Sequence, residues 1–338
     1  MSKVVLGLSG GVDSALAASI LRDEGYEVYG VFLDIGVTPP DEARAVAEQL
    51  GIGFEVVDIR AELEEKVCAP FTEAYLNGRT PNPCVMCNPT VKFPALVRAA
   101  DRIGAEYIAT GHYAKVDYDE VSGRYRLIRA DSSKDQSYML CGLGQDILSR
   151  VIFPLAQFEK ETVRQMAAQA GLSVADKSDS MEICFIPEND HGRYIGSRGY
   201  VSQPGNFVDE AGNVLGQHKG IEYYTVGQRR GLGVAAGRRI FVSRIDPKKN
   251  EIVLSDLDKM QVRDIHIKDV NWVSMAPAAE TFRAEVKVRY SKISYAAEIV
   301  LEEGGLHIVF NEEIKAPSAG QAAVFYSGDV LLGGGTIM

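Results

Sequence analysis

The sequence has few cysteines and no apolar run long enough to cross a membrane. Its five cysteines are an odd number in a chain of 338 residues, so a structural disulfide framework is not expected. Apolar stretches such as VVLGL near the start fall far short of the roughly 20 residues that span a bilayer. The N-terminal MSKVVLGLSGG also lacks the apolar core of a signal peptide. These absences predict a cytoplasmic protein with no membrane partner, and we expect a monomer.

Positive charge is also scarce, with 36 basic and 46 acidic side chains and a net charge of −10. The deficit lies in residues 1–190, which hold 18 basic and 29 acidic side chains, whereas residues 191–338 hold 18 and 17. Residues 217–250 alone hold eight basic and two acidic side chains. Such a segment is suited to the phosphates of a nucleic acid, but a solvated loop face has the same composition. Charge alone leaves both interpretations open.

Strand and helix patterns alternate over the first 112 residues. The predicted strands are 3–8, 26–35, 54–59 and 105–112, and the predicted helices are 12–24, 41–52 and 61–78. This alternation predicts an α/β fold, a parallel sheet with helices on both faces. Beyond about residue 190 Gly, Pro and Asn become more frequent, and strand-like runs from 262 onward predict a small all-β barrel or sandwich.

The segment GLSGGVDS, residues 7–14, follows the first strand and opens the first helix. Glycines let the backbone approach an anion, and the helix N-terminus supplies N–H donors. It is neither a Walker A loop nor a dinucleotide fingerprint, because Gly-Lys-Ser/Thr and G-x-G-x-x-G are both absent. SGGVDS resembles the PP-loop of the ATP pyrophosphatases, which leave AMP on a carbonyl oxygen. The resemblance implies ATP as a substrate and Asp13 as a residue that holds Mg²⁺ or orients the pyrophosphate.

Three cysteines lie in two further segments. PNPCVMCN holds Cys84 and Cys87, a spacing that fits a metal clip, a redox couple or one reactive thiol beside a bystander. Cys184 lies in SDSMEICFI, residues 178–186, where taken alone it would be a core residue. Cys68 and Cys141 match no motif and are expected to pack in the core.

Together these segments closely resemble the bacterial tRNA-specific 2-thiouridylases, which place sulfur on the wobble uridine of certain tRNAs. The matching segments, in family order, are GLSGGVDS (7–14), GRTPNPCVMCN with KF (78–93), ATGHYAK (109–115), KDQSYML (134–140), SDSMEICFI (178–186), YYTVGQRRGLG (223–233) and VRY (288–290). The resemblance implies three domains: a PP-loop catalytic domain over 1–190, a small central tRNA-binding domain over 191–261, and a C-terminal β-barrel over 262–338.

The resemblance also implies the site residues. Cys87 is the implied catalytic thiol, and Cys184 is the implied carrier of the persulfide. The residues implied to bind ATP are Gly7, Leu8, Ser9, Gly10, Gly11, Val12, Asp13, Ser14, Leu33 and Gly111. Those implied to contact tRNA are Asn82, Pro83, Cys84, His112, Lys134, Asp135, Gln136, Arg289, Tyr290 and Gln321.

The implied reaction is ATP-dependent 2-thiolation of tRNA, with sulfur from a persulfide donor or relay protein. Many relatives have Asp where this chain has Cys84, and this departure leaves two routes open. Cys84 is either a tolerated variant beside a persulfide mechanism, or one of three ligands, with Cys87 and Cys184, of a [4Fe–4S] cluster.

Two other functions compete with this reaction. Another PP-loop tRNA-modifying ligase would not need the thiols, and the intact SGGVDS argues against a non-catalytic tRNA-binding or sulfur-carrier protein.

Overall fold

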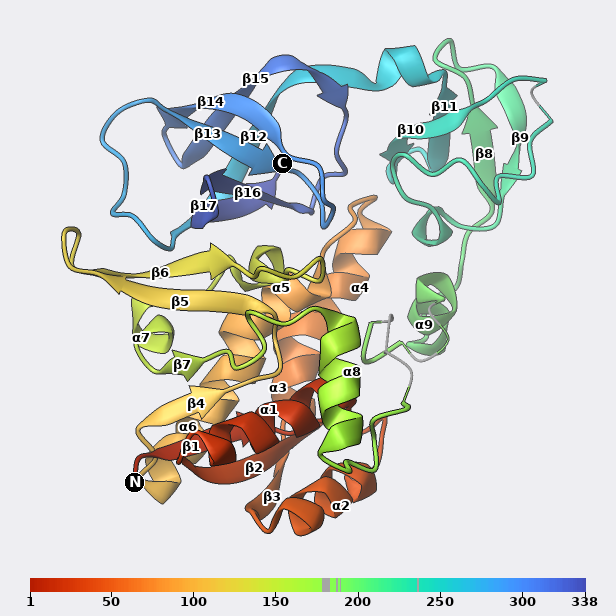
Figure 1. The fold of residues 1–338 in the computed structure, drawn as a ribbon. Coiled ribbons are helices and arrows are strands. Elements are labelled where there is room, and N and C mark those ends of the chain that lie inside the picture. The colour runs from red at the N-terminus through yellow and green to blue at the C-terminus, as the bar shows by residue number, and fades with distance from the viewer. Residues whose placement is uncertain (178–182, 187, 189, 236) are drawn as a thin grey trace.

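The computed structural model describes residues 1–177, 183–186, 188, 190–235 and 237–338. Figure 1 shows three parts: a parallel sheet with its helices at the N-terminus, a small β domain in the middle of the chain, and a barrel at the C-terminus. The predicted α/β fold class, with a central domain and a C-terminal barrel, is confirmed.

The N-terminal sheet has five strands, all parallel, in the order β3-β2-β1-β4-β7. Its strands are β1 (Lys3–Gly7), β2 (Glu27–Asp34), β3 (Gly53–Asp58), β4 (Tyr107–Ala109) and β7 (Val151–Ile152). The first four were predicted from their apolar runs. The fifth is two residues long and leaves no pattern in the sequence.

Helices cover both faces of this sheet. Successive side chains of a strand point to opposite faces, so the apolar residues of β1 are buried on both sides. Val5 packs with Phe93 and Leu96 in one core, and Val4 packs with Leu16 and other helical residues in another. The helices are α1 (Val12–Asp23), α2 (Asp41–Leu50), α6 (Phe93–Ile103) and α8 (Lys160–Gln169). The first core includes α6, and the second includes α1, α2 and α8.

Two helical stretches beside the sheet contain a π turn. The predicted helix 61–78 consists of α3 (Arg60–Leu63), the π turn η1 (Glu64–Cys68) and α4 (Ala69–Leu76). The segment with Cys84 and Cys87 is α5 (Pro83–Cys87), and the π turn η2 (Asn88–Lys92) joins it to α6. Such turns are frequent at functional sites.

The central domain is built on a four-stranded sheet in the order β10-β11-β8-β9. Its elements are α9 (His191–Ser197), β8 (Gly205–Val208), β9 (Val214–His218), η4 (Ile221–Tyr223), β10 (Phe241–Asp246) and β11 (Glu251–Ser255), followed by η5 (Leu257–Met260). Phe207, Val242 and Ile252 are fully buried and form the centre of its core.

The barrel closes through pairing of β12 with both β15 and β17. Its six strands are β12 (Gln261–Trp272), β13 (Phe282–Lys287), β14 (Tyr295–Glu302), β15 (Gly305–Lys315), β16 (Ala322–Ser327) and β17 (Val330–Ile337). A hairpin of β5 (Ala114–Asp119) and β6 (Arg124–Arg129) joins the same sheet, since β6 pairs with β17. The short elements η3 (Ser137–Leu140) and α7 (Gln145–Leu148) follow it. A hairpin that precedes β7 of the parallel sheet in the chain thus extends the separate sheet of the barrel.

All five cysteines are free thiols, and Cys68 and Cys141 are each 4% exposed, as expected for packing residues. Among the described residues, no helix is both long enough and apolar enough to cross a lipid bilayer.

Candidate active site

The glycine loop, residues 8–11, turns sharply between β1 and α1. Ser14 closes it: its Oγ accepts a hydrogen bond from the Ser9 N–H at 3.1 Å and donates to the Gly11 carbonyl at 3.1 Å. Gly10 has a φ of +76°, and a Cβ there would lie 3.0 Å from the backbone nitrogen of Ala43. Both facts require glycine at position 10.

Gly111, which follows β4, contacts the start of α1. A Cβ at position 111 would lie 3.0 Å from the backbone nitrogen of Ser14. Leu33 lies near the end of β2, the neighbour of β1 on its other side. The residues expected to bind ATP therefore come together at the carboxyl ends of β1, β2 and β4, where ligands of such sheets bind.

Two residues that sequence reasoning missed hold the carboxylate of Asp13. The buried Tyr113 donates its hydroxyl hydrogen to Asp13 Oδ1 at 2.7 Å, and the Lys160 ammonium lies 2.7 Å from Oδ1 and 2.8 Å from Oδ2. Tyr113 could have been found from the sequence, because it belongs to the matched segment ATGHYAK. Lys160 lies in none of the matched segments. Lys177 adds a second ammonium, donating to the Gly10 carbonyl at 3.4 Å. Lys177 also pairs with Glu42, so both ammonium groups beside the loop are balanced by carboxylates, and the N–H groups at the start of α1 are the donors for an anion.

The segment with Cys84 and Cys87 is fixed from both ends. Asn82 caps α5, because its Oδ1 accepts hydrogen bonds from the Cys84 N–H at 3.1 Å and the Val85 N–H at 3.3 Å. Asn88 is 1% exposed, and its amide donates to the Met139 carbonyl at 2.8 Å. The cap and this buried bond hold Cys87 between two anchored residues.

Cys87 and Cys184 share one electrostatic environment. Burial raises the pKa of both thiols, and the nearby ammonium of Lys92 lowers both. The Cys184 side chain reaches the surface, yet the protein around it raises its pKa to about 11 through desolvation, with Cys87 and Cys84 adding to the rise. The matched segment 178–186 contains residues 178–182, which lie outside the described part of the chain. Because the pKa of each thiol is raised above its ordinary value, Cys87 and Cys184 are protonated at neutral pH.

The three thiols do not form a site for a single ion. The sulfur atoms of Cys84, Cys87 and Cys184, all in the described part of the chain, are not gathered within 4.8 Å of one another. A zinc ion bound by thiolates at about 2.3 Å needs such a spacing.

His112 follows Gly111 beyond the carboxyl end of β4. Its ring stacks on Phe93 with centroids 5.9 Å apart, and its Nδ1 lies 2.6 Å from Thr110 Oγ1. Burial and the Lys92 cation hold the pKa of His112 well below its usual range. The imidazole is therefore neutral at pH 7 and is able to exchange a hydrogen bond with an uncharged base.

Comparison with known proteins identifies the family. Three family models match consecutive parts of the chain: a tRNA methyl transferase HUP domain over residues 2–188, a tRNA methyl transferase PRC-barrel domain over 194–256, and an aminomethyltransferase beta-barrel domain over 262–337. The tRNA-specific 2-thiouridylase MnmA of Clostridium botulinum strain Eklund 17B is 43% identical, covering 99% of this chain and 97% of that protein. The tRNA-specific 2-thiouridylase MnmA of Carboxydothermus hydrogenoformans is 44% identical over the same shares.

The chain belongs to the tRNA-specific 2-thiouridylase family. The predicted resemblance is confirmed. Among solved structures, a 4-thiouridine synthetase–RNA complex with bound ATP covers 56% of this chain and 46% of its own, with 19% identity and a TM-score of 0.37. That likeness is too slight to support an inference.

Asp135 and Gln136, two of the residues expected to contact tRNA, form hydrogen bonds within the protein. Asp135 accepts a hydrogen bond from the Ser137 N–H at 3.1 Å and pairs with the buried Lys287 at 3.7 Å. Gln136 Oε1 accepts from the Tyr113 N–H at 3.1 Å. These contacts join the segment to the barrel and to the residue that holds Asp13.

Gln321 connects the barrel to the loop that carries Cys84 and Cys87. Its side-chain amide donates to the Thr80 carbonyl at 2.8 Å, and the Thr80 N–H donates to the Ala319 carbonyl at 2.8 Å. The barrel thus fixes the residues just before Pro83, which is itself buried.

Tyr290 and Arg289 are exposed at the same junction. Tyr290 is 46% exposed, its hydroxyl donates to the Asp135 carbonyl at 3.2 Å, and its ring centroid is 6.0 Å from that of Tyr138. Burial raises the pKa of Tyr290, and the charges of Asp135 and Cys84 add to the rise, which places the ring near Cys84. This exposed aromatic ring offers a surface on which a nucleobase can stack.

A groove of about 480 Å³ lies in the central domain between residues 229 and 240. Three exposed arginines line it, and we call it the arginine groove: Arg229, Arg238 and Arg239. Arg238 pairs with Asp256 at 3.1 Å. Part of its lining belongs to the segment YYTVGQRRGLG, which the Lys315 ammonium holds against the barrel by donating to the Gly227 carbonyl at 3.3 Å.

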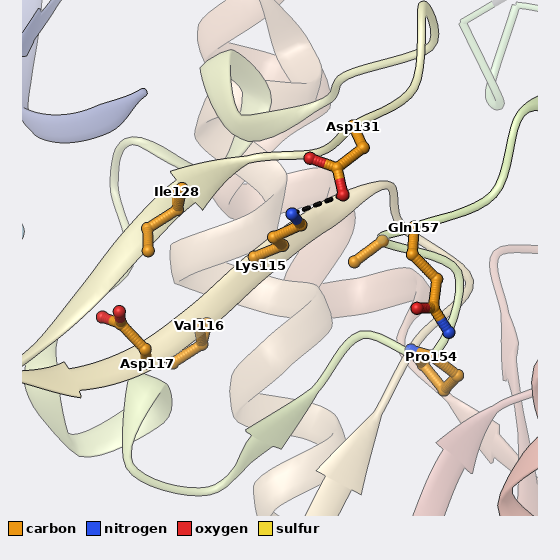
Figure 2. Close-up of a pocket in the computed structure, with 8 residues that line it drawn as sticks. Lys115, Val116, Asp117, Ile128, Asp131, Pro154 and Gln157 are labelled. Atoms are coloured by element: carbon orange, nitrogen blue, oxygen red, sulfur yellow. Dashed lines mark hydrogen bonds and ion pairs between the residues drawn. The ribbon is translucent and has the colours of Figure 1, made fainter. Parts of the chain in front are cut away.

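A second hollow, of about 360 Å³, lies beside the hairpin β5–β6. Figure 2 shows Lys115 and Asp131 pointing toward each other across it, and they form an ion pair at 2.5 Å. Its lining contains no thiol and no residue of the glycine loop. We assign it no part in the reaction.

Proposed function

We propose that this chain catalyses ATP-dependent 2-thiolation of the wobble uridine of tRNA. The observation that carries the proposal is the placement of His112. This neutral imidazole directly follows Gly111 at the glycine loop, and the Lys92 cation that acts on it also acts on the thiols of Cys87 and Cys184. An activating site and a sulfur-transfer site are therefore adjacent, as the two-stage reaction requires.

The first stage activates the base. The uridine C2 oxygen attacks the α-phosphorus of ATP, and pyrophosphate leaves, so that C2 carries AMP as a good leaving group. The N–H groups of the glycine loop and the start of α1 bind the phosphates, and Lys160 offers positive charge beside Asp13. Asp13 is the acidic residue that would hold Mg²⁺ together with the phosphates. Bound there, the ion would neutralise the departing pyrophosphate.

The second stage transfers sulfur. A donor protein leaves a persulfide on Cys184, and its terminal sulfur attacks C2 as AMP departs. The Cys87 thiolate then attacks the Cys184 sulfur. The S–S bond breaks, its electron pair stays with the sulfur on C2, and a Cys87–Cys184 disulfide forms. A dithiol reductant restores both thiols. Only thiolates perform these attacks, which gives the Lys92 ammonium a direct role.

Binding of tRNA uses both parts beyond the catalytic domain. The arginine groove binds backbone phosphates, since guanidinium groups pair well with phosphate. Tyr290 stacks on the uridine after it leaves the anticodon loop, and Arg289 and Lys134 contact the flanking phosphates. We place this reaction in the cytoplasm and expect a monomer.

The test is reconstitution with unmodified tRNA, ATP–Mg²⁺ and a persulfide donor, followed by nucleoside mass spectrometry. We expect 2-thiouridine from the natural chain and none from C87S or C184S. Both variants should still release pyrophosphate in a tRNA-dependent manner, because the first stage does not use the thiols. Full thiolation by both serine variants would favour another PP-loop ligase, and absence of tRNA-dependent pyrophosphate release would favour a non-catalytic tRNA-binding protein.

The substitution C84D separates the two sulfur routes. Three thiols are the number needed to hold a [4Fe–4S] cluster with one open iron, so the donor set at Cys84, Cys87 and Cys184 is compatible with a cluster. The persulfide route needs only Cys87 and Cys184, and C84D should then stay active. Brown, iron-containing protein from anaerobic purification, together with inactive C84D, would instead establish the cluster.

A further inference from the structure

Two of the five histidines lie side by side on the outer surface of the barrel. His266 on β12 is directly opposite His307 on β15. The neighbouring residues Ile265 and Ile308 point inward to the barrel core, so the alternation of a strand directs both histidines outward. Neither belongs to the site described above.

Two carboxylates enclose this pair from opposite edges of the rings. On one edge, Asp264 Oδ2 lies 2.9 Å from His307 Nε2 and 4.0 Å from His266 Nε2. On the other edge, Glu302 lies 2.9 Å from His266 Nδ1 and 3.7 Å from His307 Nδ1. The rings are stacked, with centroids 4.4 Å apart and planes at 7°. Both Nε2 atoms therefore face Asp264, and both Nδ1 atoms face Glu302.

We propose that Asp264, His266 and His307 bind a divalent transition-metal ion of the zinc type. One ligand atom from each lies within 4.8 Å of the others. A tetrahedral ion with bonds of about 2.0–2.2 Å separates its ligands by about 3.4 Å, a spacing that lies between the two distances from Asp264. The two rings lie nearly parallel, so each must turn about its Cα–Cβ and Cβ–Cγ bonds for both Nε2 lone pairs to converge on one ion. The fourth position is open to water.

Glu302 acts as a positioning residue for this ion. A histidine that binds a metal through Nε2 usually donates its Nδ1 hydrogen to a carboxylate, which fixes the tautomer and the ring orientation. Glu302 stands at the Nδ1 edge of both rings. The two carboxylates lie on opposite edges of the ring pair, one at the Nε2 atoms and one at the Nδ1 atoms, which matches the two roles that a metal site requires.

The ligand set selects the class of ion. Two imidazoles and one carboxylate suit Zn²⁺, Ni²⁺ or Cu²⁺, whereas Mg²⁺ and Ca²⁺ prefer oxygen ligands throughout. The nearby cation Lys268 is paired with Asp269 at 3.6 Å. A bound ion would join β12 to β15, and ligands that bind only the folded state raise its stability. The site is thus a structural one that ties together two strands of the barrel.

Zinc also binds thiolates, so the test uses the full chain with the substitutions C84S, C87S and C184S. We expect equilibrium dialysis to leave one Zn²⁺ per chain and the melting temperature to rise with added Zn²⁺. Adding H266A, H307A or D264N should abolish both effects, and E302Q should weaken binding by about ten- to hundredfold. E312Q, a change at an exposed residue of the same β15, should leave binding unchanged.

Cobalt serves as a spectroscopic probe that does not depend on stability. Bound to the triple-serine chain, Co²⁺ should give the absorption of a tetrahedral ion with nitrogen and oxygen ligands, and E302Q should require more Co²⁺ for the same signal. The proposal is wrong if the triple-serine chain retains no zinc, or if zinc binding survives the double change H266A/H307A. E302Q removes only a charge and changes no side-chain shape, so its result stands even if an alanine variant does not fold.

Discussion

The ammonium of Lys160 lies 2.7 and 2.8 Å from the two carboxylate oxygens of Asp13, although the residues are 147 positions apart in the chain. Asp13 belongs to the first turn of α1, and Lys160 is the first residue of α8. The two helices pack together in the same core. The ion pair therefore fixes a lysine ammonium beside the loop expected to bind the phosphates of ATP, with its charge balanced by Asp13.

Replacing Lys160 by Met should weaken the ATP-dependent step. The change removes two charge-assisted hydrogen bonds to Asp13, each worth about 1.5–3 kcal/mol at most. Because part of that energy is recovered by water, we expect tRNA-dependent pyrophosphate release to fall by about ten- to hundredfold. K3M is the matched control, since Lys3 is a surface lysine of β1 paired with Glu27 at 3.5 Å. Equal rates for K160M and K3M would contradict the assignment.

The raised pKa of Cys184 predicts an unusual pH dependence of its reactivity. Below the pKa, the thiolate fraction of a cysteine rises about tenfold for each pH unit. With a pKa of about 11, Cys184 has less thiolate at pH 7 than an ordinary cysteine, whose pKa is about 8.5. Alkylation by iodoacetamide, followed by peptide mass spectrometry, should therefore keep accelerating from about pH 7 to pH 10. A plateau near pH 9 would show that the thiol is not desolvated.

Lys92 should control the thiols and His112 together. Its positive charge lowers the pKa of Cys87, Cys184 and His112, so K92M should raise all three. At a fixed pH below the thiol pKa, alkylation of both cysteines should slow by roughly three- to tenfold, which corresponds to about half to one pKa unit. K92R retains the charge and should behave like the natural chain. If K92R is as slow as K92M, the role of Lys92 is packing and not charge.

The parts of the fold that depend on local pattern could be predicted from sequence. The apolar runs of β1 to β4 and the turn of the glycine loop follow from strand propensity and from the need for glycine at position 10. The hairpin β5–β6 was not predicted. Its pairing with β17 cannot be predicted from the local sequence pattern, because β17 lies far away in the chain. The π turns η1 and η2 were missed as well, since a hydrophobic pattern hardly distinguishes them from an α-helix.

The site shows the same division. Cys87 and Cys184 were predicted from segments of the family, and their pairing in the reaction stays a prediction. Lys160 could not be predicted, because its role arises only when α8 packs on α1. Gln321 remains a predicted tRNA contact, and its hydrogen bond to the Thr80 carbonyl could not be predicted from the segment that contains it. Resemblance transfers the identity of a residue, whereas the contacts that it makes depend on tertiary structure.

The arginine groove should account for part of the salt dependence of tRNA binding. Each cation that neutralises a phosphate releases counterions, so removing one cation lowers the slope of log K against log salt by about one. The double change R229A/R239A should therefore weaken binding and reduce this slope by about two, with little change in thiolation at saturating tRNA. Arg229 and Arg239 line the groove and are exposed. R263A/R283A, which changes two exposed arginines of the barrel, is the matched control. Fluorescence anisotropy over a salt series measures both slopes, and equal slopes for the two double variants would exclude the groove as the site of phosphate contact.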